Sequence, residues 1–216
     1  MKIPAVTIKY NKYLDEYVTF FLENSKRAKD SGWGAWKKKN ENDIIKKVIA
    51  FQGAWKNHSK NILSSLQEIL DLEFKKNNIP VYIVNAVNRT VSDPIIIGSN
   101  YSLDGFIDML THEIIHVLIS DNLGQKHKKL KEFYKKTYPE SEFDETYSHI
   151  LVYAVHSKIY DKYLPDRKDV DIKRSAKHGN RGYSIAWDIV TREGSDNIIS
   201  EFKKWNKKTA PHIVRR

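Results

Sequence analysis

Two histidines and a glutamate lie close together near the middle of the chain, in the stretch Thr111-His-Glu-Ile-Ile-His116. Residues four apart in an α-helix share one face, so the imidazoles of His112 and His116 can bind the same metal ion. Glu113 follows the first histidine, where its carboxylate can reach a water molecule on that ion. The spacing therefore predicts a metal site at which Glu113 acts on a water.

The residues around this motif predict that its helix is buried. Most are apolar, namely Met109, Leu110, Ile114, Ile115, Val117 and Leu118. Buried polar groups cost free energy unless they find partners, and one divalent cation would satisfy both histidines and the carboxylate. The alternative is a pair of core histidines that are hydrogen-bonded to their neighbours. We prefer the metal site.

A second segment, from Ser141 to about Tyr163, is expected to form a helix that supplies another ligand. Glu145, His149, Val152 and His156 recur at spacings of four, three and four, which places them on one helical face. Catalytic zinc has three protein ligands and one open position. We expect this face to provide the third ligand.

Both segments resemble the zincin metallopeptidases. His112-Glu113-Ile-Ile-His116 resembles the zinc-binding helix of that superfamily, which implies that the two histidines bind Zn²⁺ and that Glu113 is the general base. The longer metzincin pattern would have a third histidine at position 122, where this chain has Asn122. The resemblance is therefore gluzincin-like rather than metzincin-like.

Asp144-Glu145-Thr-Tyr-Ser-His149 is similar to the gluzincin pattern Asn-Glu-x-x-Ser-Asp. In that pattern the Glu is the third zinc ligand, and the acid four residues later orients a ligating histidine. The resemblance thus implies that Glu145 binds the metal. His149 stands where the family has Asp, and histidine is itself a good zinc ligand. The third ligand is either Glu145 or His149.

Zincins often use a Tyr, His or Arg beyond the second helix to stabilise the oxyanion of the transition state. The resemblance suggests Tyr183, His178 and Arg181 for this role, together with Tyr153 from the second helix itself. Their spacing selects none of the four.

Periodicity predicts an α+β fold that is mainly helical. We expect a single compact domain over 1–216, with a mainly helical N-terminal region over 1–76. A zincin-like core over 77–165, with a small sheet and two metal-binding helices, is expected to follow, and then a helical closing segment over 166–216. Val81–Val87 and Pro94–Gly98 are expected strands, and Ile3–Tyr10 an edge strand. The zincin resemblance implies that Ile95–Ser99 is the edge strand of the sheet and borders the substrate. From its residues alone, a strand with no such role is equally possible.

Helix boundaries are also predicted by the sequence. The apolar stripe from Ile44 to Leu70 indicates one long helix or two, with Asn42 or Asp43 as the cap. Ser102 or Asp104 is expected to cap the motif helix, and Gly124 to end it.

Composition narrows the chemistry. The chain contains no cysteine, which excludes disulfides and the thiolate-rich ligand sets of structural zinc sites. Its net charge of +10 comes mainly from lysine, which permits binding to nucleic acid but is more typical of a solvated surface. No signal peptide or membrane span is predicted, so the expected location is cytoplasmic.

The leading functional hypothesis is a zinc metallopeptidase that hydrolyses a peptide or protein substrate. One alternative is a DNA-associated protease, which the positive charge suggests. Another is a non-catalytic metal-binding or interaction protein that has kept the zincin helix. The sequence does not indicate the substrate or the oligomeric state.

Overall fold

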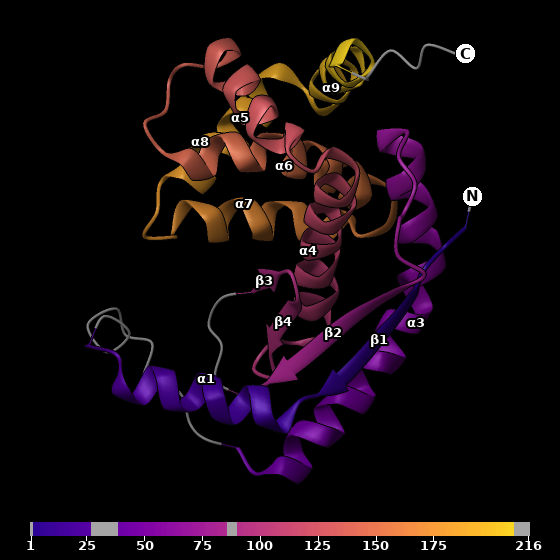
Figure 1. Cartoon of the computed structure of the whole chain (residues 1–216), viewed down its shortest axis with the longest axis vertical. Coiled ribbons are helices and arrows are strands. Elements are labelled where there is room, and N and C mark those ends of the chain that lie inside the picture. Colours follow the sequence, from indigo (N-terminus) through magenta and orange to yellow (C-terminus); the bar gives the residue numbers. More distant parts are fainter. Residues whose placement is uncertain (1, 27–38, 86–89, 210–216) are drawn as a thin grey trace. The chain divides into compact units, whose positions relative to one another are not determined.

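The structure is a computed structural model that describes residues 2–26, 39–85 and 90–209 (Figure 1). The described part is mainly helical and contains a small mixed sheet of four strands, which confirms the coarse α+β prediction. The chain divides into two compact units, described here one at a time. The first comprises residues 1–63 and 74–118, and the second residues 64–73 and 119–216.

The sheet belongs to the first unit and has the strand order β1-β2-β4-β3. Strands β1 (Ala5–Tyr10), β2 (Asn78–Val84) and β4 (Ile95–Gly98) are mutually parallel, and β3 (Val91–Ser92) pairs antiparallel with β4. The prediction that β1 is an edge strand is confirmed. Strand β2 begins three residues earlier than predicted, and residues 86 and 87 of that prediction lie outside the described residues.

The prediction that Ile95–Ser99 forms the sheet edge is wrong. Strand β4 is an inner strand, with β2 on one side and β3 on the other. The end of the sheet beyond β4 is formed by β3. A strand of two residues is too short to show the alternation of apolar and polar residues by which strands are recognised in sequences.

A single helix of 30 residues, α3 (Glu41–Leu70), accounts for the long apolar stripe. Its cap is Asn40, whose side-chain oxygen accepts a hydrogen bond from the Asp43 backbone N–H at 2.9 Å, so the prediction of a cap at Asn42 or Asp43 is wrong. The ring of Phe51 in α3 stacks on Phe106 with centroids 3.9 Å apart. Both rings are fully buried.

Phe106 lies in the first turn of α4 (Leu103–Leu123), the helix that carries the motif. The Ser102 hydroxyl accepts a hydrogen bond from the Gly105 N–H at 3.0 Å, as expected of a helix cap. After the last turn, Gly124 has a φ of +49°, a left-handed conformation that glycine adopts without steric cost, and its N–H bonds to the Ser120 carbonyl. The predicted limits of the motif helix are confirmed at both ends.

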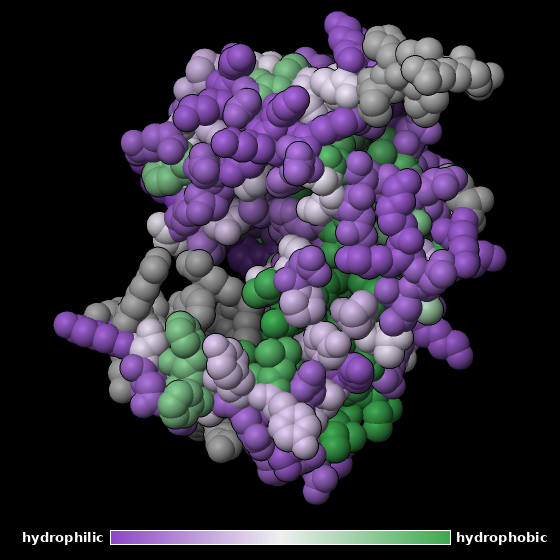
Figure 2. All heavy atoms as spheres, viewed as in Figure 1, coloured by the Kyte–Doolittle hydropathy of each residue, from purple (hydrophilic) through white to green (hydrophobic). Residues whose placement is uncertain are grey.

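Helix α1 (Lys12–Asn24) is capped by Asn11, whose side chain accepts a hydrogen bond from the Leu14 N–H. Asp15 connects this helix to the sheet by accepting the Asn85 backbone N–H at 2.7 Å. The outer face of α1 carries four exposed aromatic side chains, Tyr13, Tyr17, Phe20 and Phe21. Figure 2 shows pale green, hydrophobic colouring over part of α1.

The second unit is a cluster of helices around α6 (Asp144–Tyr163), which contacts four neighbouring helices (Figure 1). The neighbours are α5 (Lys126–Thr137), α7 (Lys168–Ala176), α8 (Gly182–Glu193) and α9 (Ser195–Thr209). A 3₁₀ turn, η1 (Pro165–Arg167), precedes α7. Helix α6 is buried almost all round, as expected of a helix that is apolar on most sides.

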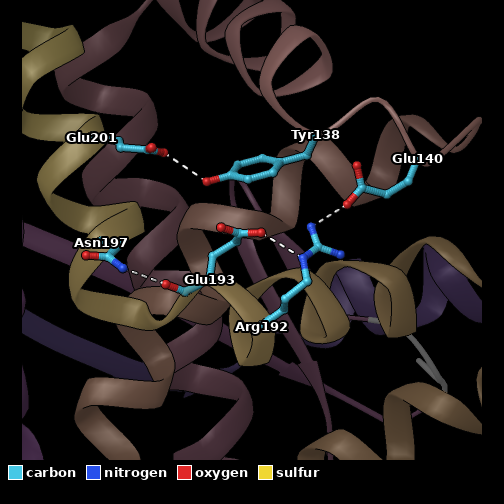
Figure 3. A network of polar contacts seen from close by, with 6 residues as sticks. All are labelled: Tyr138, Glu140, Arg192, Glu193, Asn197 and Glu201. Carbon is cyan, nitrogen blue, oxygen red and sulfur yellow. Dashed lines mark hydrogen bonds and ion pairs between the residues drawn. The ribbon is translucent and has the colours of Figure 1, made fainter.

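A polar network joins three parts of this unit (Figure 3). The Tyr138 hydroxyl donates to Glu201 of α9 at 2.9 Å, and Arg192 of α8 donates to Glu140 at 2.5 Å and to Glu193 at 2.7 Å. Burial and the neighbouring Glu201 raise the pKa of Tyr138 well above its usual value. These bonds hold the turn after α5 against α8 and α9.

Within the residues that the structure describes, no helix is both long and apolar enough to cross a membrane.

Candidate metal centre

The first two sequence-predicted ligands lie one turn apart on α4, and their rings point to a common position. The Nε2 atoms of His112 and His116 are 3.2 Å apart. Two nitrogens bound to one tetrahedral zinc at about 2.0–2.1 Å would be separated by about 3.3 Å. The pair thus has the separation that one shared ion requires, with no change in the backbone.

Three histidines are the candidate ligands and are called the three-histidine group below. His112 and His116 lie on α4 in the first unit, and His149 lies on α6 in the second. His112 and His149 are buried, and His116 is half-buried.

His149 is held by its own helix. Its Nδ1 atom lies 2.8 Å from the backbone carbonyl oxygen of Glu145 and 3.1 Å from the Ser148 hydroxyl. A proton on Nδ1 that is donated to this carbonyl leaves the lone pair on Nε2, which is the arrangement usual for metal-binding histidines. Burial lowers the pKa of His149 to about 4, so the ring is neutral at neutral pH, the form that binds metals.

Glu145, the other sequence-predicted third ligand, is not a member of the three-histidine group. Its half-buried side chain lies in the first turn of α6. The contact that connects Glu145 to the site is made by its backbone, through the carbonyl that bonds to His149.

Glu113 is buried, with 4% of its surface exposed, and both carboxylate oxygens accept hydrogen bonds. The Ser92 hydroxyl donates to Oε2 at 2.6 Å, and the Thr90 hydroxyl donates to Oε1. Burial raises the pKa of Glu113, and the two hydroxyl bonds act in the opposite direction because they favour the charged form.

The four suggested transition-state stabilisers occupy different surroundings. Tyr183 packs edge-on against His149, with ring centroids 4.7 Å apart, and against His178 at 4.6 Å. Tyr153 also lies beside His149, at 5.4 Å, but its hydroxyl is 3.4 Å from Ser175 and its ring stacks on Trp187. Arg181 is exposed before the first turn of α8. Tyr183 and Tyr153 are thus the two candidates in direct ring contact with His149.

Thr90 and Ser92 were not found by sequence reasoning. Serine and threonine residues in loops do not recur at a characteristic spacing in the sequence. The two-residue strand that contains Ser92 was also not recognised. Thr90 and Ser92 are two residues apart, so in an extended chain their side chains face the same side. This spacing is the one feature of the sequence that could have suggested that they act together.

The residues present fit a catalytic type of metal site. Imidazole nitrogens are ligands that suit zinc, and the carboxylate of Glu113 lies next to the first of these histidines in the sequence. Comparisons of the chain with known protein families, with curated proteins and with solved structures find no match.

Proposed function

We propose that this protein is a zinc-dependent peptidase in which His112, His116 and His149 bind the ion and Glu113 is the general base. The observation that carries the proposal is the pair of Nε2 atoms of His112 and His116, 3.2 Å apart on α4, with Glu113 adjacent in sequence to the first of them. A structural zinc site would have no use for the carboxylate, whereas a hydrolytic site requires it.

Zinc held by three imidazoles would lower the pKa of a bound water from about 15.7 towards about 7 and would polarise a substrate carbonyl. Glu113 would accept a proton from the water that attacks the peptide carbonyl carbon. Protonated Glu113 then donates this proton to the nitrogen of the leaving amine as the C–N bond breaks. Burial, which raises the pKa of Glu113, favours the second step by making the protonated form accessible.

His149 serves this chemistry through its orientation. The Nδ1 atom lies 2.8 Å from the Glu145 carbonyl oxygen, and a proton that Nδ1 donates to this carbonyl leaves the lone pair on the opposite ring nitrogen. Carbonyl and carboxylate partners of this kind orient ligating histidines and raise their basicity. The proposal therefore assigns Glu145 to the support of a ligand through its backbone and not to the ion.

The test compares zinc content and hydrolysis of a broad peptide library for wild type, Glu113→Gln and His112→Ala. We expect one zinc per chain and hydrolysis for wild type. Glu113→Gln should keep zinc and lose about 10²- to 10⁴-fold in rate, as is typical when a general base is removed. His112→Ala should lose both.

His58→Ala is the matched control, since His58 is a half-buried histidine on α3 outside the three-histidine group. It should keep zinc and activity. Hydrolysis by Glu113→Gln at the wild-type rate would rule out the assigned role, and a zinc-loaded wild type without activity on any peptide would instead favour the metal-binding or interaction protein.

A further inference from the structure

The carboxylate of Glu113 is held by two hydroxyl groups from one short stretch of chain. Ser92 donates to Oε2 at 2.6 Å, and Thr90 donates to Oε1. Thr90 and Ser92 are two residues apart, and alternate side chains of an extended chain face the same side. Val91, between them, is 45% exposed, as expected of a side chain that faces the other way.

The sheet fixes this stretch in place. Ser92 is paired with Ile95 and Val91 with Ile96 of β4, and β4 is in turn paired with β2. The two hydroxyls are therefore presented from an element that is hydrogen-bonded to the inner sheet, next to the helix that carries Glu113.

Two hydroxyl bonds leave the carboxylate able to act as a base. A carboxylate has about four lone-pair sites, and each hydroxyl occupies one of them on a different oxygen. At least one site therefore stays available for the proton of a water molecule. The bonds restrict the rotamers of a side chain that would otherwise have to be fixed at each turnover.

We propose that Thr90 and Ser92 are positioning residues that hold Glu113 at the angle needed for proton transfer. The inference rests on the proposed function, because it assumes that Glu113 is the general base. Both hydroxyls act through Glu113, whose carboxylate oxygens accept their hydrogen bonds. Their effect is on geometry, which must be kept within about 0.5 Å for efficient catalysis.

The experiment uses the full chain with zinc bound and compares Ser92→Ala, Thr90→Val and the double variant with wild type. We expect kcat to fall by about 10- to 100-fold in the double variant, the range caused by a misplaced catalytic group, while KM and zinc content stay at wild-type values. Ser92→Thr and Thr90→Ser keep the hydroxyls and should restore most of the rate. Thr7→Val is the matched control, because the Thr7 hydroxyl bonds to Asn78 in the same sheet.

A second readout does not depend on activity. In the zinc-free chain, Ser92→Ala should lower the urea concentration at the midpoint of unfolding. In a Glu113→Ala background the same substitution should lower it much less, because the hydroxyl then has no carboxylate to bond. Equal losses in the two backgrounds would show that the hydroxyl and carboxylate do not interact.

The outcomes separate the two proposals. An active wild type whose kcat is unchanged or increased in the double variant would overturn the positioning role and leave the proposed function intact. A zinc-loaded wild type that hydrolyses no peptide would overturn the proposed function, whatever the midpoints show.

Discussion

The Nδ1 atom of His149 lies 2.8 Å from the backbone carbonyl oxygen of Glu145, one turn earlier in α6. The sequence indicates one of these two residues as the third ligand and leaves the choice open. In the structure both take part in a single hydrogen bond, with the ring of one and the backbone of the other. This division of roles has a direct consequence for metal binding, because side-chain substitution removes the ring but not the carbonyl.

His149→Ala should therefore weaken zinc binding strongly, and Glu145→Ala should not. Loss of a partner that orients a ligand typically costs about 10- to 100-fold in affinity, so loss of a ligand should exceed that range. Glu145→Ala keeps the carbonyl, and it removes only a first-turn carboxylate whose favourable effect on helix stability is about 0.3–1 kcal/mol. Competition titration with a chromophoric zinc chelator measures both affinities.

The two variants also act as controls for each other, because both lie on α6 and both shorten a side chain to alanine. Circular dichroism must show that each remains folded. A loss of zinc in Glu145→Ala that equals the loss in His149→Ala would show that the carboxylate is the ligand.

The ring of Tyr183 packs against His149 on one side and His178 on the other, at 4.7 and 4.6 Å. Edge-to-face packing of this kind contributes about 0.5–1.5 kcal/mol beyond the burial of area. Tyr183→Ala should let the His149 ring turn and so weaken zinc binding several-fold. Tyr183→Phe keeps the packing and should retain wild-type affinity, as measured by the same chelator competition.

A fall in zinc affinity in Tyr183→Phe would contradict the packing explanation and point to the hydroxyl instead. The phenylalanine variant also isolates the hydroxyl kinetically. If that hydroxyl stabilises the oxyanion, kcat should fall by about 10²- to 10³-fold with zinc still bound.

The motif helix is the part of the fold that the sequence predicts best, because every signal for it is local. Ser102 begins it with a side-chain bond to Gly105, and Gly124 ends it in a left-handed conformation. His112 and His116 follow from helical periodicity alone. Their Nε2 atoms then lie 3.2 Å apart because residues i and i+4 share one face.

Features that depend on long-range pairing were predicted poorly. Strand β4 was expected at the edge of the sheet, but β3, which contains only Val91 and Ser92, pairs with its outer side. The bond from Ser92 to Glu113 connects residues 21 positions apart, and no periodicity reports such a contact. The cap of α3 at Asn40 was missed for a different reason, since several Asn and Asp residues stand side by side there and each is a suitable cap.

Zinc should stabilise the folded chain, because the proposed ligands would bind one ion only in that state. Zinc that binds the native chain alone raises the free energy of unfolding by about 2.7 kcal/mol at a concentration 100 times its Kd. The melting temperature should therefore rise with added zinc and fall with a chelator. His116→Ala should abolish the rise, and His58→Ala should keep it. A similar rise in His116→Ala would show that the stabilising zinc binds elsewhere.

Phe51 and Phe106 form the stacked pair that joins α3 to the first turn of the motif helix, and both rings are fully buried. Phe51→Ala should lower the free energy of unfolding by about 3–5 kcal/mol, because it removes the ring and leaves a cavity. Ile49→Ala is the matched control on the same helix, since Ile49 is 62% exposed and its loss should change stability by no more than about 0.5 kcal/mol. Urea unfolding of the zinc-free chain measures both. Phe106 lies in the first turn of the helix that carries His112 and His116, so weakened packing there also loosens the element that sets their spacing. Equal losses in the two variants would show that the stacked pair does not support α4.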